Sequence, residues 1–376
     1  MKGTRLIAAL CASLAISTTS VAADTYQTKK VPIKVDVLAS GLEHPWGIEV
    51  LPDGAFLVTE RDGNLRLVED GQISNPIRGL PKIRANGQGG LLDVALANDF
   101  ESSGTIFLSF SQPGRGGAGT AIASATLDRD GPNPRLRDVQ TIFSMDNKSR
   151  GGRHFGSRIS VANDDTIYFS IGDRGEPERA QDMQDHAGAI LRINADGSVP
   201  ADNPFASGGG ALPELWSKGH RNPQGMDFDS RTNVLYTVEH GARGGDEINR
   251  PEPGKNYGWP VISYGRHYSG GKIGVGTEAD GYEQPLFYWD PSIAPGGMAV
   301  YRGDMFPEWD GDLLVTALKD QLLVRLDRNN AGEIVDEERL LQDTYGRLRE
   351  VKQAPDGSLL VLTDESDGAI LRISRQ

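Results

Sequence analysis

The 376-residue sequence has almost no cysteine, since its single cysteine is Cys11, near the N-terminus. Beyond residue 11 it therefore has no disulfide, no cysteine nucleophile and no cysteine metal site. Long apolar runs are also missing, because no segment after the first residues approaches the ~20 apolar residues that cross a bilayer. Positive charge is in deficit, with 39 Lys and Arg against 52 Asp and Glu, which argues against nucleic acid or membrane as a partner.

The first 23 residues have the pattern of a secretory signal peptide. Lys2 and Arg5 precede an apolar run at 6–16, and small residues occupy 20–23. We expect cleavage after Ala23, which leaves a mature protein that is periplasmic or secreted. The mature domain is then expected to span residues 24–376.

Six segments share a polar turn followed by an alternating, β-rich run that ends in a polar residue. The turns are rich in Pro, Asp, Asn and Gly, which supply the backbone conformations of hairpins. The runs are 55–60, 105–109, 166–173, 234–239, 313–319 and 358–364. Second strand-like pieces follow several of them, so each repeat holds several strands. Six such repeats with little helical periodicity predict an all-β, six-bladed β-propeller, with two unrelated β domains as the alternative.

One glycine-rich segment, 114–119, matches the dinucleotide fingerprint G-x-G-x-x-G by letter. It precedes a β-like run instead of opening a helix, so we interpret it as a hairpin loop. Walker loops, Gly-x-Ser-x-Gly elbows and His-Glu-x-x-His segments do not occur in the sequence, and nicotinamide, nucleotide and serine-hydrolase chemistry lose support. The longer connections, such as 174–185 and 251–283, are expected to form binding loops at the blade ends.

Polar segments at the predicted strand ends contain most of the candidate chemistry. They are 87–92, 153–158, 219–225, 239–249, 256–260, 318–319 and 347–349. Together with Pro45-Trp46-Gly47, and in this order, they resemble the soluble quinoprotein glucose and aldose sugar dehydrogenases, most closely the bacterial aldose sugar dehydrogenase branch. The resemblance implies a six-bladed propeller, monomeric or homodimeric, that binds pyrroloquinoline quinone (PQQ) and Ca²⁺. It also implies oxidation of aldose mono- or disaccharides at C1 to the lactone, with an external electron acceptor.

The resemblance assigns the general base to His154, which accepts the proton of the anomeric hydroxyl while hydride leaves C1. Imidazole suits this role because its unperturbed pKa is near neutrality. Considered alone, a histidine beside glycine and phenylalanine is more often a hydrogen-bonded structural residue. Arg221 is implied beside the reactive quinone carbonyl, where it stabilises negative charge on the oxygen.

PQQ carries three carboxylates, so an acidic protein has to gather cations locally to bind it. Lys319, Arg347 and Arg349 match the cationic positions of the family. Two arginines one residue apart on a strand project to the same face, although a solvated strand edge would show the same spacing. The other implied cofactor contacts are Gln88, Asn222, Tyr268 and, as a cover over the ring, Trp289.

Calcium prefers oxygen ligands, and the resemblance places the cofactor's ion on the main-chain carbonyls of Gly241 and Ala242. Its implied role is Lewis-acid polarisation of the quinone. A second, structural calcium would map to Glu247 and the region of Tyr257. Glu247 is equally compatible with an ordinary surface carboxylate.

The sequence departs from the glucose-specific branch at two positions. Arg153 stands where that branch has an acidic residue, and Arg174 stands where it has glutamine. Both are expected near the sugar pocket, and we predict a broad substrate range. Two other functions remain open, a metal-dependent propeller lactonase and a non-catalytic propeller that binds a glycan or a protein. The cationic residues argue against the lactonase, which requires inward carboxylates and no quinone.

Overall fold

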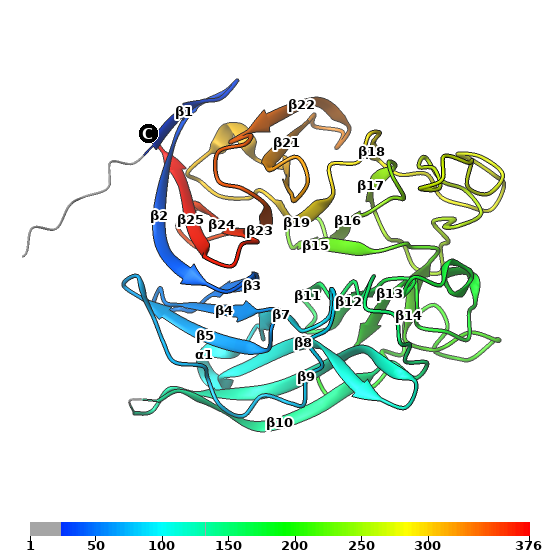
Figure 1. Cartoon of the computed structure of the whole chain (residues 1–376), viewed down its shortest axis with the longest axis horizontal. Coiled ribbons are helices and arrows are strands. Elements are labelled where there is room, and N and C mark those ends of the chain that lie inside the picture. Colours follow the sequence, from blue (N-terminus) through cyan, green and yellow to red (C-terminus); the bar gives the residue numbers. More distant parts are fainter. Residues whose placement is uncertain (1–23, 132) are drawn as a thin grey trace, which may run out of the picture.

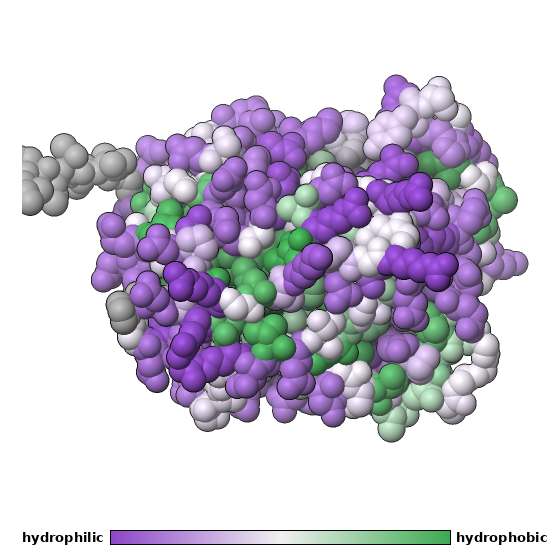
Figure 2. Space-filling model, turned by 60° about the horizontal axis from the view of Figure 1, so that its bottom comes forward, coloured by the Kyte–Doolittle hydropathy of each residue, from purple (hydrophilic) through white to green (hydrophobic). Residues whose placement is uncertain are grey.

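The computed structural model describes residues 24–131 and 133–376, which are almost entirely β-structure. Six sheets surround a central axis (Figure 1), so the predicted six-bladed β-propeller is confirmed. The predicted signal peptide lies outside the described residues. No helix in the described ranges is long and apolar enough to cross a membrane. The face turned forward in Figure 2 is mostly hydrophilic, with apolar groups in small clusters.

In blades 1 to 5, each sheet consists of strands that follow one another in the chain. Blade 1 contains β3 (Pro45–Val50), β4 (Phe56–Glu60), β5 (Asn64–Glu69) and β6 (Gln72–Ile73). Blade 2 contains β7 (Leu91–Leu96), β8 (Thr105–Gly114), β9 (Gly117–Asp128) and β10 (Arg135–Ser144). Blade 3 contains β11 (Ile159–Val161), β12 (Ile167–Ile171), β13 (Ala189–Ile193) and β14 (Leu215–Lys218).

The second half of the chain repeats this order. Blade 4 contains β15 (Pro223–Asp229), β16 (Val234–Glu239), β17 (Asp246–Asn249) and β18 (Phe287–Trp289). Blade 5 contains β19 (Pro295–Val300), β20 (Leu313–Ala317), β21 (Leu322–Arg328) and β22 (Ile334–Leu340). Blade 6 contains β23 (Leu348–Gln353), β24 (Leu359–Thr363), β25 (Gly368–Arg375), β2 (Pro32–Leu42) and β1 (Asp24–Gln27). The short helices are α1 (Phe100–Ser103), η1 (Pro177–Gln181) and η2 (Pro307–Trp309).

The two ends of the chain close the ring in blade 6. Strand β2 pairs antiparallel with β25, with Val35 opposite Ile373, and β1 covers the outer side of β2. This pairing satisfies the edge of the last sheet and ties the first described residues to the last. Blades 5 and 6 also share an apolar core in which Phe306 stacks on Trp309, with ring centroids 4.4 Å apart.

The six predicted β-rich runs are confirmed, and each is the second strand of a blade: β4, β8, β12, β16, β20 and β24. The glycine-rich segment is the tight turn between β8 and β9, with Gly114 paired to Gly117, so the hairpin interpretation is confirmed. The sequence did not predict the innermost strand of each blade. These strands are β3, β7, β11, β15, β19 and β23. They combine buried apolar residues with charged residues directed at the axis, and this mixture obscures the alternating pattern.

Candidate active site

A cavity of about 710 Å³ opens at one end of the propeller axis. Its walls come from the loops before β7 and β11, the loop that contains η1, and the long connection between β17 and β18. A second cavity of about 160 Å³ lies on the axis itself and shares Gln88 with the first. The predicted binding loops at 174–185 and 251–283 therefore contribute to the larger cavity.

His154 faces this cavity and is held by a carboxylate. Its Nδ1 lies 2.5 Å from Oδ1 of Asp173, at the end of the segment that follows β12. The other oxygen of Asp173 accepts a hydrogen bond of 2.9 Å from Nε1 of Trp259. Because Asp173 accepts the proton on Nδ1, the neutral imidazole keeps a lone pair on Nε2, which is the arrangement that a general base requires.

The same contacts set the protonation of the pair. Burial lowers the pKa of His154, and the nearby guanidinium of Arg221 adds to the effect, while the hydrogen bond with Asp173 opposes it. Burial alone would raise the pKa of Asp173, but its hydrogen bond with His154 brings that pKa below the usual value. His154 is therefore neutral and Asp173 ionised around neutral pH.

The loop that contains His154 is fixed by Arg174. The guanidinium donates to the carbonyl oxygens of Gly151 (2.8 Å) and Arg153, and it stacks 3.4 Å above the ring of Phe155. His154 has a left-handed backbone with φ of 53°, which is costly for a residue with a Cβ and needs such support. Arg174 is 1% exposed, so its side chain lies beneath the loop of His154 and does not line the larger cavity.

Arg221 and Asn222 enter the site just before β15. The guanidinium of Arg221 lies 5.2 Å from the ring centroid of Trp259 and donates to the carbonyl oxygens of His240 (3.1 Å) and Gly241 (2.5 Å). Asn222 accepts from the amide of Gly156 at 3.2 Å. Arg221 thus lines the larger cavity, whereas Asn222 is 1% exposed and lines neither cavity.

The predicted cationic residues divide into two groups. Arg347 and Arg349 line the smaller cavity, and Arg349 donates to Asp364 at 2.5 Å and to Gln224 at 3.1 Å. Lys319 lines neither cavity, because its Nζ donates to the carbonyl oxygen of Ser292 at 2.6 Å and its side chain is 57% exposed. Only the arginine pair therefore faces the axis directly.

The buried donors in this region suit an anionic, oxygen-rich group. Nδ2 of Asn222, Nε of Arg221 and Nε of Arg349 are buried without a hydrogen-bond partner among the described residues. Buried polar atoms are normally paired, so three unpaired donors around one cavity system call for acceptors from a ligand or from water. Carboxylates and carbonyls, as in PQQ, are such acceptors.

The predicted metal ligands lie on the neighbouring loop. The carbonyl of Gly241 already accepts from Arg221, and the carbonyl of Ala242 accepts from the amide of Arg266 at 2.9 Å. A carbonyl oxygen has two lone pairs, so a cation can share either of them. The described residues contain no group of three acidic or histidine side chains placed to hold a metal ion, so the other ligands of such a cation have to come from the main chain, the cofactor or water.

Glu247 and Tyr257 lie around a small void of about 10 Å³ beside this loop. Burial raises the pKa of Glu247, and repulsion by Glu239 adds to it. No basic side chain of the described ranges pairs with Glu247 within 4.0 Å. The hydroxyl of Tyr257 is already used, accepting from the amide of Glu252 at 3.0 Å and donating to the carbonyl of Arg250. A cation at Glu247 would relieve the repulsion, and Tyr257 could contribute only its main chain.

Two aromatic residues predicted to contact the cofactor, Tyr268 and Trp289, lie away from the cavity interior. Tyr268 lies at the mouth of the larger cavity and is 74% exposed, so it reaches the rim and not the interior. Trp289 was the wrong choice for the covering tryptophan, because it is buried against Phe287 in the core between blades 4 and 5. Trp259 is the tryptophan that lines the cavity. Trp259 belongs to the polar segment 256–260, and its polar neighbours could have indicated that it lies at the site.

Asp173 is the residue whose role we missed. It is the polar end of a predicted β-rich run, and in the structure it is fully buried and joins His154 to Trp259. The available signal was a carboxylate in a Gly-Asp-x-Gly turn directly after a buried strand. A contact across 19 residues cannot be read from that spacing alone.

Comparison with known proteins agrees with this geometry. The aldose sugar dehydrogenase YliI of Escherichia coli (strain K12) is 43% identical over 347 residues, covering 91% of this chain and 93% of that protein. A solved apo-form of the soluble aldose sugar dehydrogenase from Escherichia coli matches with a TM-score of 0.87 and 43% identity, over 92% of this chain and 100% of that one. The PQQ-bound form of an aldose sugar dehydrogenase from Streptomyces coelicolor matches with a TM-score of 0.76 and 28% identity, over 92% and 98%.

The family itself is given by a sequence model described as glucose / sorbosone dehydrogenase, which matches residues 42–372. That range includes blades 1 to 5, most of β23, β24 and β25 of blade 6, and every residue proposed for the site. The resemblance inferred from the polar segments is therefore confirmed: the chain belongs to the glucose/sorbosone dehydrogenase family.

Proposed function

We propose that this chain oxidises aldose sugars at C1 to the lactone, using PQQ and Ca²⁺, and passes the electrons to an external acceptor. The observation that carries the proposal is the His154–Asp173 pair, which faces a cavity next to a group of unpartnered cationic and amide donors. The PQQ-bound relative supports the choice of cofactor.

The proton step belongs to His154. Nε2 accepts the proton of the anomeric hydroxyl, and Asp173 stabilises the resulting imidazolium through Nδ1. Trp259 donates to the other oxygen of Asp173 at 2.9 Å, and the amide of Gly175 donates to Oδ1 at 2.6 Å, so the carboxylate that holds the imidazole is itself fixed. Hydride departs from C1 as the hydroxyl proton leaves, and PQQ when bound supplies the two-electron acceptor for it.

The cofactor carboxylates would be bound by Arg347 and Arg349, and its remaining oxygens by Asn222 and Gln88, with Arg221 beside the group that gains negative charge. Lys319 can join them only by leaving Ser292. Tyr268 can contact the cofactor or the sugar only at the rim. The carbonyls of Gly241 and Ala242 would hold Ca²⁺, and a structural Ca²⁺ would lie at Glu247 beside the main chain of Tyr257.

We propose that residues 24–376 act as one domain, exported as a periplasmic or secreted protein after removal of residues 1–23. The cavity opens to solvent and Arg153, at its edge, is exposed, which suits mono- and disaccharides alike. The protein would act as a monomer or a homodimer, with the electron acceptor as a separate partner.

The test is reconstitution of purified cofactor-free protein. PQQ and Ca²⁺ are added separately and together, while an artificial dye reports oxidation of a panel of aldoses. We expect activity only with both, its loss on chelation, and no rescue by NAD. Activity with NAD alone, or lactone hydrolysis without PQQ, would contradict the proposal.

A further inference from the structure

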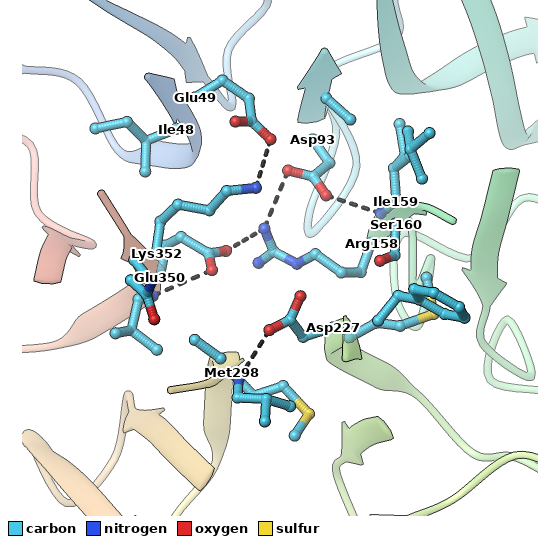
Figure 3. Close-up of a pocket in the computed structure, with 18 of the residues that line it drawn as sticks. Ile48, Glu49, Asp93, Arg158, Ile159, Ser160, Asp227, Met298, Glu350 and Lys352 are labelled. Atoms are coloured by element: carbon cyan, nitrogen blue, oxygen red, sulfur yellow. Dashed lines mark hydrogen bonds and ion pairs between the residues drawn. The ribbon is translucent and has the colours of Figure 1, made fainter. Parts of the chain in front are cut away.

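The propeller axis contains a further cavity of about 350 Å³, which shares no lining residue with the candidate active site and which we call the acidic cavity. Figure 3 shows that its cations are already paired, since Lys352 contacts Glu49 at 2.5 Å and Arg158 is shared between two carboxylates. Apart from the ion pair of Asp229 with Arg302, its charged lining residues are Glu49, Asp93, Arg158, Asp227, Glu350 and Lys352. Every cation that lines the acidic cavity is therefore paired with a carboxylate of the chain.

The smaller cavity of the candidate active site has the opposite balance of charge. It is lined by three arginines, Arg61, Arg347 and Arg349, and, among the described residues, by one carboxylate, Asp364. Its histidine, His240, is neutral at pH 7, because burial lowers the pKa of that imidazole to about 4. Two positive charges are therefore left without a counter-charge, in a protein whose formal net charge is -13.

The carboxylate of Asp364 is committed to partners other than Arg61. Its Oδ2 accepts from Arg349 at 2.5 Å, and its Oδ1 lies 3.0 Å from Nδ1 of His44. Burial alone would raise the pKa of Asp364, but the charge of Arg349 and, more weakly, that of Arg61 hold it well below its usual value. Asp364 is therefore ionised, and its single negative charge cannot neutralise all three guanidiniums.

Arg61 follows β4 directly, and its main chain is held on both sides. Its amide donates to the carbonyl of His44 at 3.2 Å, and its carbonyl accepts from the amide of Leu91 at 3.1 Å. Within the described part of the chain, its guanidinium has no carboxylate within 4.0 Å and donates no hydrogen bond. The charge of Arg61 acts on Asp364, another residue of the same lining, so the guanidinium lies on the cavity side.

Gly90 fixes the course of the Arg61 side chain. A Cβ at Gly90 would lie 1.7 Å from the carbonyl oxygen of Arg61 and 3.0 Å from its Cγ. Only glycine allows this close approach, and the apolar stem of Arg61 packs directly against it. The guanidinium is therefore presented to the cavity by a side chain whose base is already ordered, which lowers the entropic cost of binding a ligand.

An unpaired donor on another wall of the cavity indicates the same kind of ligand. Nε of Arg349 is buried without a hydrogen-bond partner among the described residues, and Arg349 is 6% exposed. Buried donors are normally paired, and carboxylate oxygens are the strongest acceptors for a guanidinium. A carboxylate has two oxygens with several lone pairs, so it can accept from two arginines at once.

We propose that Arg61 is the third cation of the cofactor site and binds a carboxylate of PQQ together with Arg347 and Arg349. It takes the place that the sequence assigns to Lys319, which lines neither cavity. A third guanidinium also makes up for the positive charge that Asp364 neutralises at Arg349. The inference rests on the proposed function, because it concerns the same cofactor.

The test compares the PQQ affinity of cofactor-free variants, measured by fluorescence quenching as PQQ is titrated in the presence of Ca²⁺. Arg61→Met removes the guanidinium and keeps an apolar stem against Gly90, and we expect it to weaken PQQ binding about 10-fold or more. Arg61→Lys should recover part of the affinity, because it restores the charge without the planar fork. Arg84→Met removes an exposed arginine that lines neither cavity, and it should bind PQQ as the wild type does.

Thermal unfolding of the cofactor-free variants separates binding from a structural role. Arg61→Met should leave the Tm nearly unchanged, because the guanidinium has no partner within the described chain to lose. If Arg61→Met does not fold, Arg61→Gln is measured in its place. A lower Tm without recovery of affinity in Arg61→Lys would assign Arg61 a structural role and overturn the inference.

Arg347→Ala distinguishes a failure of this inference from a failure of the proposed function. If the wild type binds PQQ and Arg347→Ala weakens the binding, but Arg61→Met binds as the wild type does, the inference is wrong and the proposed function stands. If the wild type does not bind PQQ, both are wrong.

Discussion

The two regions of the propeller axis are built on the same strands but have opposite chemistry. In the candidate active site, Arg221 lies beside His154, and Arg347 and Arg349 line the adjoining smaller cavity. In the other cavity, carboxylates from β3, β15 and β23 outnumber the two cations. Arg221 and Asp227 are six residues apart along one strand and its approach, and Arg349 and Glu350 are neighbours in the chain.

The difference shows how a propeller separates functions along its axis. A strand advances about 3.3 Å per residue, so a few residues on each innermost strand suffice to reverse the charge of the cavity. Side chains that contact one another separate the two regions. Nε of Arg158 donates to the carbonyl of Gln224 at 2.9 Å, and the side-chain oxygen of Gln224 accepts from Arg349. The guanidinium of Arg158 stacks 4.1 Å above the ring of Trp46. The two cavities of this acidic protein therefore differ in the charge of the side chains that line them.

The largest expected effect is the loss of turnover in a variant of the cationic region, and it would show that catalysis depends on this region. His154→Ala should lower kcat by about 10²-fold to 10⁴-fold, because it removes the general base. PQQ affinity should be nearly unchanged, since the arginines remain. Turnover at saturating PQQ and fluorescence quenching on PQQ binding measure the two quantities separately. Near-normal turnover would show that another group accepts the proton.

A second variant would separate binding from catalysis within that region. Arg347→Ala should weaken PQQ affinity about 10-fold, because a charged hydrogen bond is lost at a site that is partly exposed. Excess PQQ should restore most of the turnover. Arg372→Ala, far from both cavities, is the control and should leave the affinity unchanged. A fall in turnover that PQQ does not reverse would assign Arg347 to another role.

The pH dependence of kcat/KM tests how the charges of the candidate active site set the pKa of His154. Neutral His154 is the active form, and burial lowers its pKa, so kcat/KM should fall only as the pH drops through a value below 6.5. Arg153→Gln removes one cation that lowers this pKa, so the acidic limb should move to higher pH by a fraction of a unit. High salt should shrink the shift, because Arg153 is exposed. Arg150→Gln is the matched control, and an unmoved limb with Arg153→Gln would contradict the expectation.

The smallest effect concerns the acidic cavity. The pKa of Asp227 is raised in the folded state above its ordinary value of 3.8, so stability is lost as the pH rises from the ordinary value to the raised one and stays lost above it. Asp227→Asn should therefore raise the Tm of ligand-free protein by about 1 to 3 °C in mildly alkaline buffer. The gain should shrink as the pH falls and disappear only below about 3.8, where Asp227 is protonated in the unfolded chain as well. Thermal unfolding at several pH values checks this, and a lower Tm for Asp227→Asn at high pH would contradict it.

Much of the fold could be predicted because hairpin signals are local. Each second strand of a blade is preceded by a turn with its own Pro, Asp, Asn or Gly, and six such signals sufficed to count the blades. The candidate site was predicted through the polar segments, which fixed His154, Arg221 and the pair Arg347 and Arg349. The innermost strands were missed, since charged residues that face an axial cavity look like surface residues in the sequence.

By itself the sequence determined the blade count, the family and the identity of most polar groups in the site, because these depend on residue type and short spacing. The tertiary structure alone decided which groups meet. Asp173 reaches His154, Arg174 holds the loop from beneath, Trp259 and not Trp289 lines the cavity, and Lys319 turns to Ser292. The physical reason is that hydrogen bonds and ion pairs depend on distances of a few ångströms, and closure of the ring sets those distances between residues far apart in the chain.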